Sequence, residues 1–187
     1  MKKIIIGSLI GFVLIIGVWL TSSYNSMVKA NLAVDTQWAQ VETQYQRRID
    51  LIPSLVGAVK GIMKQETTVF TAIADARQGY AGARTVNEKA VAAGQLEGAL
   101  ARLLVITENY PQLRSIEAVT NLQTQLEGTE NRVSVERTRF NDIVGTFNTQ
   151  VTTFPGNIVA KIFGFEKRAF FKSAETAEKA PVVDLTQ

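Results

Sequence analysis

The chain has 187 residues, about the length of one domain. It contains no Cys and no His, which excludes disulfide frameworks, zinc sites of the usual Cys/His type, thiol nucleophiles and His-dependent catalytic triads. The formal net charge is +3, and the 20 basic residues fall to 18, against 17 acidic ones, when Lys2 and Lys3 are set aside. Because the remaining charges alternate in sign along the chain, no nucleic-acid partner is predicted. With 46% hydrophobic residues and four Pro, the composition favours an all-α protein with a packed core.

The N-terminal segment is long and apolar enough to cross a bilayer. Residues 4–20 carry no charge, and the uncharged stretch continues to Tyr24. As a helix, Ile4 to Tyr24 spans roughly 32 Å, close to the hydrocarbon thickness of about 30 Å. The alternative is a cleaved secretory signal, but the apolar run exceeds the usual length and no Ala-x-Ala follows it. We therefore predict a retained transmembrane anchor over residues 1–24, in contact with the lipid bilayer through residues 4–24.

Flanking charges predict the orientation of this anchor. Lys2 and Lys3 lie on one side, and Lys29 lies near the other. The positive-inside bias therefore places the N-terminus in the cytoplasm and the rest of the chain on the non-cytoplasmic side. Trp19 and Tyr24 fall where the outer headgroup region is expected, as interfacial aromatic residues do.

Two glycines lie one helical turn apart in the anchor. Gly7 and Gly11 form a Gly-x-x-x-Gly motif, which lets two transmembrane helices pack closely and would give a homo-oligomer. The alternative is that Gly is simply frequent in transmembrane helices.

A helical period begins at Asn31 and passes through Pro53. Its phase has no reset at this proline, so we predict one long helix bent there; a separate break near Gly61 is the alternative. A turn is predicted at residues 78–82 (QGYAG), and Thr85-Val-Asn-Glu88 fits the capping box of a new helix. The apolar residues of the first period, spaced by three or four with one gap at Glu66, are Val34, Trp38, Val41, Tyr45, Ile49, Ile52, Val56, Val59, Met63, Phe70 and Ile73.

Two further helices follow. The first carries Leu96, Leu100 and Leu103 and is predicted to end near Asn109, because Pro111 disfavours helix at the residue before it. The second contains a heptad and stops at Phe154-Pro-Gly. The heptad residues are Val119, Leu126, Val133, Phe140, Phe147 and Phe154.

These periods predict a left-handed bundle of three to four long helices over residues 25–172, rather than an extended two-stranded coiled coil. The fold is therefore predicted as all-α, with an N-terminal transmembrane helix before the bundle. One contiguous core is expected to contain Trp38, Tyr45, Ile52, Val56, Leu126, Val133, Phe140 and Phe147.

The C-terminal part divides into an apolar segment and a polar tail. Residues 156–171 (GNIVAKIFGFEKRAFF) combine aromatic and aliphatic side chains with Lys161, Lys167 and Arg168. The segment fits either a basic amphipathic helix on a membrane surface or a cap at the end of the bundle. Residues 173–187 are small and polar and are predicted to be a disordered tail.

Several strings of the sequence resemble the LemA family. Among them are RRIDLIPSLV at 47–56, YPQL at 110–113, TENR at 129–132 and FPGN at 154–157. The resemblance implies a bacterial inner-membrane protein with one N-terminal anchor, an up-and-down helical bundle and no established enzymatic activity. Some members of the family are encoded beside membrane metalloproteases or TPM-domain proteins, which makes such a protein an expected partner. Gln65 stands where relatives often carry His, so no role of that His is carried over.

Two opposite charges interrupt the apolar faces of the long helices. Arg48 lies three residues after Tyr45 on the first face, and Glu130 lies four residues after Leu126 on the heptad face. A lone buried charge is costly, so we predict that Arg48 and Glu130 pair across the interface and fix its register. The alternative is that both side chains extend to solvent at the edge of the face.

No pattern in the sequence predicts catalysis. The sequence lacks a P-loop, a dinucleotide-binding fingerprint and a nucleophile elbow. Glu127 and Glu130 share a helical face, but solvated or ion-paired carboxylates are favoured over a metal site. We predict no cofactor, no enzyme, and a membrane-anchored scaffold or interaction module of the cell envelope. The alternative is a ligand-sensing or signalling accessory that transmits binding through the bundle to the anchor.

Overall fold

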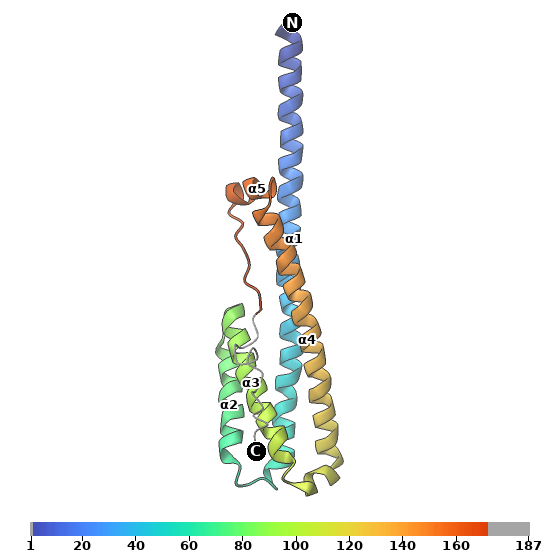
Figure 1. The fold of residues 1–187 in the computed structure, drawn as a ribbon, viewed down its shortest axis with the longest axis vertical. Coiled ribbons are helices and arrows are strands. Elements are labelled where there is room, and N and C mark those ends of the chain that lie inside the picture. The colour runs from blue at the N-terminus through green and yellow to red at the C-terminus, as the bar shows by residue number, and fades with distance from the viewer. Residues whose placement is uncertain (1, 172–187) are drawn as a thin grey trace, which may run out of the picture. The chain divides into compact units, whose positions relative to one another are not determined.

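The computed structural model describes residues 2–171, so the predicted tail at 173–187 lies outside the described residues. Within residues 2–171 the regular elements are all helical (Figure 1). The predicted all-α fold is confirmed. The elements are α1 (Lys2–Lys60), α2 (Thr67–Gly82), α3 (Val86–Thr107), the 3-10 helix η1 (Pro111–Ser115), α4 (Glu117–Thr152) and α5 (Gly156–Phe163).

The chain divides into two compact units, which are described separately. The first contains Met1–Gln40 and Thr138–Phe170, and the second contains Val41–Arg137. Helices α1 and α4 each contribute residues to both units.

Helix α1 joins the predicted anchor to the first helix of the bundle without interruption. It is 59 residues long and has no break at residue 24 or at Pro53. Among the described residues, α1 and α3 are long and apolar enough to cross a membrane. The large apolar side chains from Ile4 to Trp19 are exposed, whereas Leu96, Leu100 and Leu103 of α3 are buried. The difference in burial therefore distinguishes the two helices: the apolar part of α1 is a candidate anchor, and α3 is a core helix.

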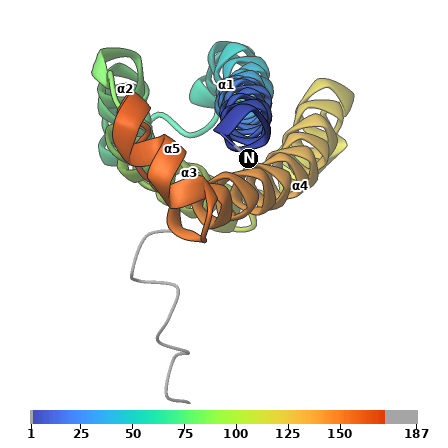
Figure 2. The ribbon, with the colours of Figure 1, turned by 90° about the horizontal axis from the view of Figure 1, so that it is seen from above.

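The second unit is an up-and-down bundle. Its segment of α1, then α2, α3 and its segment of α4 alternate in direction (Figures 1 and 2). The ring of Tyr45 on α1 packs against Tyr80 on α2, with centroids 5.2 Å apart. The predicted antiparallel up-and-down bundle is thus present.

The predicted continuation of the first helix to Ile73 is wrong, and the alternative break near Gly61 is confirmed. After Lys60 the amides of Ile62 and Met63 both donate to the carbonyl of Val59, at 3.0 and 2.9 Å. These two bonds form the last turn, and the regular helical hydrogen bonding of α1 ends there. Met63 is buried although it lies in this turn. The spacing of the apolar residues therefore stays regular although the chain reverses direction between α1 and α2. The spacing alone does not reveal this reversal.

The next connection lies slightly after its predicted position. Residues 78–82 form the last turn of α2 rather than a loop, and the chain turns at Ala83 and Arg84. The predicted capping box is confirmed: the Thr85 hydroxyl accepts a bond from the Glu88 amide, and the Glu88 carboxylate accepts one from the Thr85 amide, both at 3.1 Å. Donation by the amides of Arg84 and Thr85 lowers the pKa of the Glu88 carboxyl.

Removing this cap should weaken the start of α3. We expect Thr85→Ala to lower the free energy of unfolding by about 1 kcal/mol, because the Glu88 amide loses its acceptor. Thr71→Ala is the matched control, since the exposed Thr71 hydroxyl bonds only the Thr67 carbonyl inside α2 and Ala is a better helix former. Thermal unfolding of the detergent-solubilised chain measures both; equal melting temperatures for the two variants would contradict the prediction.

Helix α4 buries most of the predicted heptad. Val119, Leu126, Val133, Phe140 and Phe147 are all buried. Phe154 is 79% exposed, so its assignment to the heptad is wrong. The reason is that α4 ends at Thr152, and the helical phase does not extend beyond it. Of the predicted core residues outside this heptad, Tyr45 and Ile52 are buried, and Trp38 and Val56 are half-buried.

The first unit places α5 against α1 and α4. Gly156 at the start of α5 is close-packed: a side-chain carbon there would lie 2.3 Å from the Gln150 carbonyl oxygen and 3.1 Å from Met27. Gly164 ends α5 with a φ of 74°, a conformation that favours glycine. The following segment returns to α4, where the Asn148 side chain exchanges two hydrogen bonds with the Arg168 backbone, at 2.8 and 2.9 Å.

Candidate functional site

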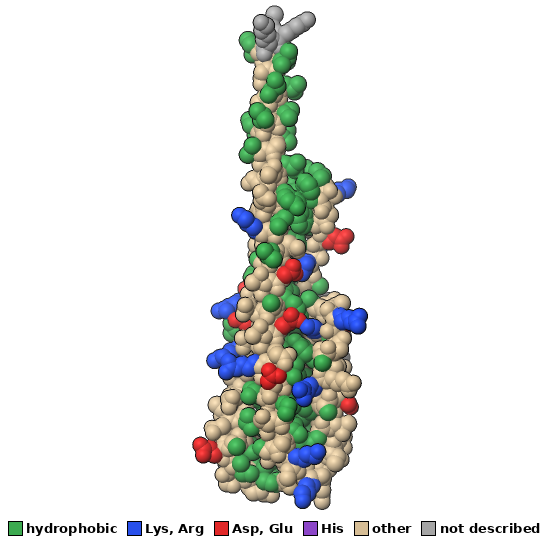
Figure 3. All heavy atoms as spheres, turned by 180° about the vertical axis from the view of Figure 1, so that it is seen from behind, with side chains coloured by type: hydrophobic (Ala, Val, Ile, Leu, Met, Phe, Trp, Pro, Cys, Tyr) green, Lys and Arg blue, Asp and Glu red, His purple; other side chains and the backbone are tan. Residues whose placement is uncertain are grey.

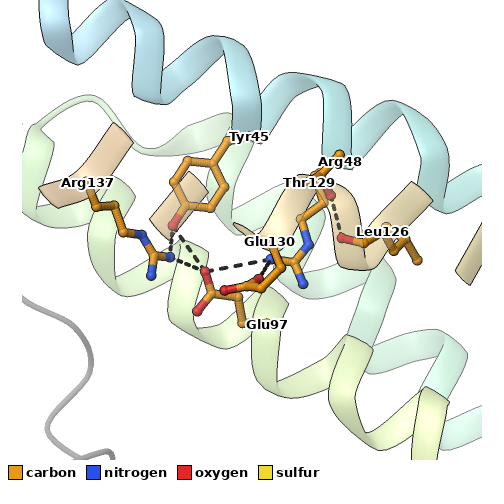
Figure 4. A network of polar contacts seen from close by, with 7 residues as sticks. All are labelled: Tyr45, Arg48, Glu97, Leu126, Thr129, Glu130 and Arg137. Carbon is orange, nitrogen blue, oxygen red and sulfur yellow. Dashed lines mark hydrogen bonds and ion pairs between the residues drawn. The ribbon is translucent and has the colours of Figure 1, made fainter. Parts of the chain in front are cut away.

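A polar network lies inside the second unit and joins three helices (Figure 4). Tyr45 and Arg48 come from α1, Glu97 comes from α3, and Glu130 and Arg137 come from α4. The four charged side chains interrupt otherwise apolar helix faces, and Tyr45 belongs to the apolar face of α1 and adds its hydroxyl to the network.

The predicted partners Arg48 and Glu130 are brought together. The Arg48 guanidinium donates to the Glu130 carboxylate. The Arg48 side chain is 8% exposed and that of Glu130 is 42% exposed. The pair therefore has a buried cation and a partly solvated anion. This geometry lies between the two alternatives considered from the sequence, a buried ion pair and two solvent-exposed side chains.

Glu97 is the shared acceptor of the network, and sequence reasoning missed it. Its carboxylate accepts from the Arg137 guanidinium and from the Tyr45 hydroxyl, the latter at 3.1 Å, and it lies 3.8 Å from Arg48. Arg137, also missed, donates to the Tyr45 hydroxyl as well. Two arginines and two carboxylates thus balance in charge.

Aromatic and charged groups extend the network toward α2. Lys89 forms an ion pair with Glu42 and lies 5.8 Å from the centroid of the Tyr80 ring. Burial, reinforced by the charge of Glu97, raises the pKa of the Tyr45 phenol, and burial together with Glu42 raises that of Tyr80. Both phenols therefore stay protonated far above neutral pH.

These raised pKa values predict alkaline destabilisation. A phenol whose pKa is higher in the folded state keeps its proton where the unfolded chain has lost it. The contribution to stability is thus complete below about pH 10, the ordinary pKa of tyrosine, and is lost as pH rises further. We expect Tyr45→Phe/Tyr80→Phe to show a shallower fall of melting temperature above that pH than the parent chain. Parallel curves for the two proteins would contradict this assignment.

The chemistry of the network is that of a structural link. Its groups are donors and acceptors for one another, and the part of the chain that the structure describes holds no group of three acidic, His or Cys side chains placed to bind a metal ion. Beside the network, a hollow of about 360 Å³ is lined by Arg48, Leu100, Leu126 and Glu130, among others. That volume is at the lower end of the range found for small-molecule sites.

The predicted Gly7 and Gly11 belong to the first unit, whereas the network belongs to the second. A side-chain carbon at Gly7 or Gly11 would meet nothing within 4 Å. No other part of the described chain therefore packs against the two glycines. Pairing of two helices through the motif stays a prediction.

Comparison with known proteins identifies relatives. The model of the LemA family matches residues 37–185. Magnetosome proteins MamQ 1 and MamQ 2 of Paramagnetospirillum magneticum are each 24% identical to the chain over 190 residues, covering 88% of this chain and 70% of the relative. Magnetosome protein MamQ of Magnetospirillum gryphiswaldense matches with the same identity and the same coverage.

Proposed function

Because the chain belongs to the LemA family, we propose that it is a membrane-anchored, non-enzymatic protein whose helical bundle serves as a scaffold for other proteins of the bacterial envelope. The observation that carries this proposal is the continuity of α1, in which a fully exposed apolar stretch passes into the bundle without a break. Such a stretch is unfavourable in water and favourable in a bilayer.

The proposed anchor is a single pass through the inner membrane, with the N-terminus in the cytoplasm and the bundle on the other side. Because the sequence contains no Cys, an introduced cysteine is the only thiol that a maleimide can label. We expect Thr149→Cys, on an exposed site of α4, to react with a membrane-impermeant maleimide in cells whose outer membrane is permeabilised and whose inner membrane is intact. Labelling that appears only after the inner membrane is opened would reverse the orientation.

A scaffold role is supported by the way the bundle uses its polar groups. Its buried charges pair with one another, as Arg48 does with Glu130 and Arg137 with Glu97. Val91 and Val105 of α3 are exposed on the outer surface, and they are the proposed points of contact with a partner. The relatives' name, magnetosome protein, refers to a cell structure and not to a reaction, which also supports this proposal.

Photo-crosslinking tests the scaffold proposal. A benzophenone amino acid at Val91 or Val105 in intact cells should capture a discrete envelope protein, and a membrane protease or a TPM-domain protein is the proposed candidate. The same group at Asp75, an exposed charged site of α2, is the control. If the α3 positions capture nothing beyond what Asp75 captures, this face is not a binding surface.

The hollow beside Arg48 favours a second function, a ligand-sensing accessory that signals through α1. Arg48 lies on the same continuous helix as the anchor. A small metabolite that raises the melting temperature of the parent chain, but not that of Arg48→Met, would favour sensing over the scaffold.

A further inference from the structure

An exposed apolar surface covers one side of α5. It consists of Phe154, Ile158, Ile162 and Phe163, here called the α5 face, of which Phe154 is 79% and Ile162 62% exposed. Figure 3 shows hydrophobic side chains gathered where α5 lies beside α1. Ile158 and Ile162 are four residues apart and share one edge of the helix, whereas Asn157 and Lys161, also exposed, share another.

The position of this face along α1 is set by aromatic contacts. The Tyr24 ring packs on Phe163 at 4.7 Å and on Phe165 at 5.9 Å between centroids. The apolar run that begins at Ile4 ends at Leu20, and Tyr24 follows one helical turn later, before the next charged residue, Lys29. This is the level at which α1 is expected to leave the hydrocarbon, where aromatic side chains are enriched. The α5 face therefore lies at the level of the lipid headgroups.

Contacts within the first unit hold α5 at that level. The Arg168 guanidinium pairs with Asp35 on α1, while its backbone bonds Asn148 on α4. At the other end of α5, Gly156 packs closely against the Gln150 carbonyl. Both ends of the segment are thus attached to the long helices, and its apolar side chains are not free to turn inward.

The charge of the segment matches a phospholipid surface. Lys161 on α5 and Lys167 after it are exposed, as is Lys29 on the neighbouring part of α1. A short helix with apolar side chains on one edge and lysine on another is the form that binds in the plane of an anionic membrane surface.

We propose that the α5 face inserts into the headgroup region of the same bilayer leaflet that surrounds Tyr24, giving the protein a second membrane contact besides its transmembrane helix. This inference rests on the proposed function, because it requires α1 to cross the bilayer. The second contact would fix the rotation of α1 and the height of the first unit above the membrane.

Depth-dependent fluorescence quenching tests this contact in the full chain. The Cys-free chain is given a single Cys at Ile162, labelled with an NBD dye and reconstituted into vesicles of phosphatidylethanolamine and phosphatidylglycerol. Nitroxide groups are placed on the lipids, either near the headgroup or near the end of the acyl chain. The dye at position 162 should show a blue-shifted emission. Its fluorescence should be strongly quenched by the shallow nitroxide and not by the deep one.

Three control positions make the outcomes distinct. Asn157→Cys, on the polar edge of α5, should be quenched less than Ile162→Cys. Thr36→Cys, at an exposed position of α1 twelve residues after Tyr24, should not be quenched. Phe12→Cys in the middle of the uncharged stretch reports the anchor and should be quenched by the deep nitroxide. Ile158→Cys is a second position on the α5 face, for use if the Ile162 variant changes the circular dichroism spectrum.

Quenching of Phe12 without quenching of Ile162 or Ile158 would overturn the inference and leave the anchor standing. A blue shift at Ile162 without quenching would also overturn it, because the α5 face would then be covered by a protein, either a second copy or a partner. No quenching at Phe12 would refute the anchor and, with it, this second contact.

Discussion

Glu97→Ala is expected to lower the free energy of unfolding by about 3 kcal/mol, the lower end of the range for removing one partner of a buried ion pair, because the Glu97 side chain is itself 26% exposed. The carboxylate serves Arg137, whose side chain is 16% exposed, and lies near Arg48, which is 8% exposed. Without Glu97, Arg137 keeps only the Tyr45 hydroxyl of the partners described above, and a phenol does not neutralise its charge. The cost is thus mainly that of a desolvated cation left without an anion.

Glu130→Ala should cost less, about 1–3 kcal/mol. Glu130 is 42% exposed, and Arg48 retains Glu97 at 3.8 Å when Glu130 is removed. Glu127→Ala, at an exposed position of the same helix, is the control and should change stability by less than about 0.5 kcal/mol. Thermal unfolding in mild detergent ranks the three variants, and a Glu130 variant less stable than the Glu97 variant would show that Glu97 is not the centre of the network.

The difference between these two carboxylates also shows what the sequence reveals. Glu130 was found because it interrupts a heptad of large side chains, where a polar residue is conspicuous. Glu97 lies on a helix face built largely of alanine, with Ala90, Ala93 and Ala99 buried. Because alanine contributes little to an apolar period counted from large side chains, the buried face of α3 looks narrower in the sequence than it is. Counting buried alanines would place Glu97, four residues after Ala93, on that face.

The start of α3 is predicted correctly from the sequence and the end of α1 is not, and the difference has a physical reason. The capping box at Thr85 was placed correctly because its hydrogen bonds are made by residues within four positions of one another. The end of α1 at Lys60 was misjudged because a helical period records only which residues are buried. Met63 is buried from a turn and Ile73 from the next helix, and their spacing happens to prolong the period.

The anchor is predicted over residues 1–24, and α1 continues from that segment to Lys60 without a break. Hydropathy changes at this point, but helix formation does not depend on hydropathy, and no Pro or Gly lies between Trp19 and Lys29 to end the helix. An unbroken helix transmits rotation and displacement along its axis better than a flexible linker would. This continuity of α1 suits either proposed function.

Phe140→Ala is expected to cost about 3–5 kcal/mol, the usual effect of truncating a buried aromatic side chain. Phe140 is buried in the first unit, where its ring meets that of Trp38 edge-on with centroids 5.2 Å apart. The variant loses this contact and leaves a cavity that helices held along their whole length cannot close. Val135→Ala is the matched control on the same helix, since Val135 is exposed and its truncation should cost less than about 0.5 kcal/mol. Melting of the full chain in mild detergent should fall by roughly 10 °C for Phe140→Ala and hardly change for Val135→Ala. Equal melting temperatures would mean that the heptad of α4 does not form the core of the first unit.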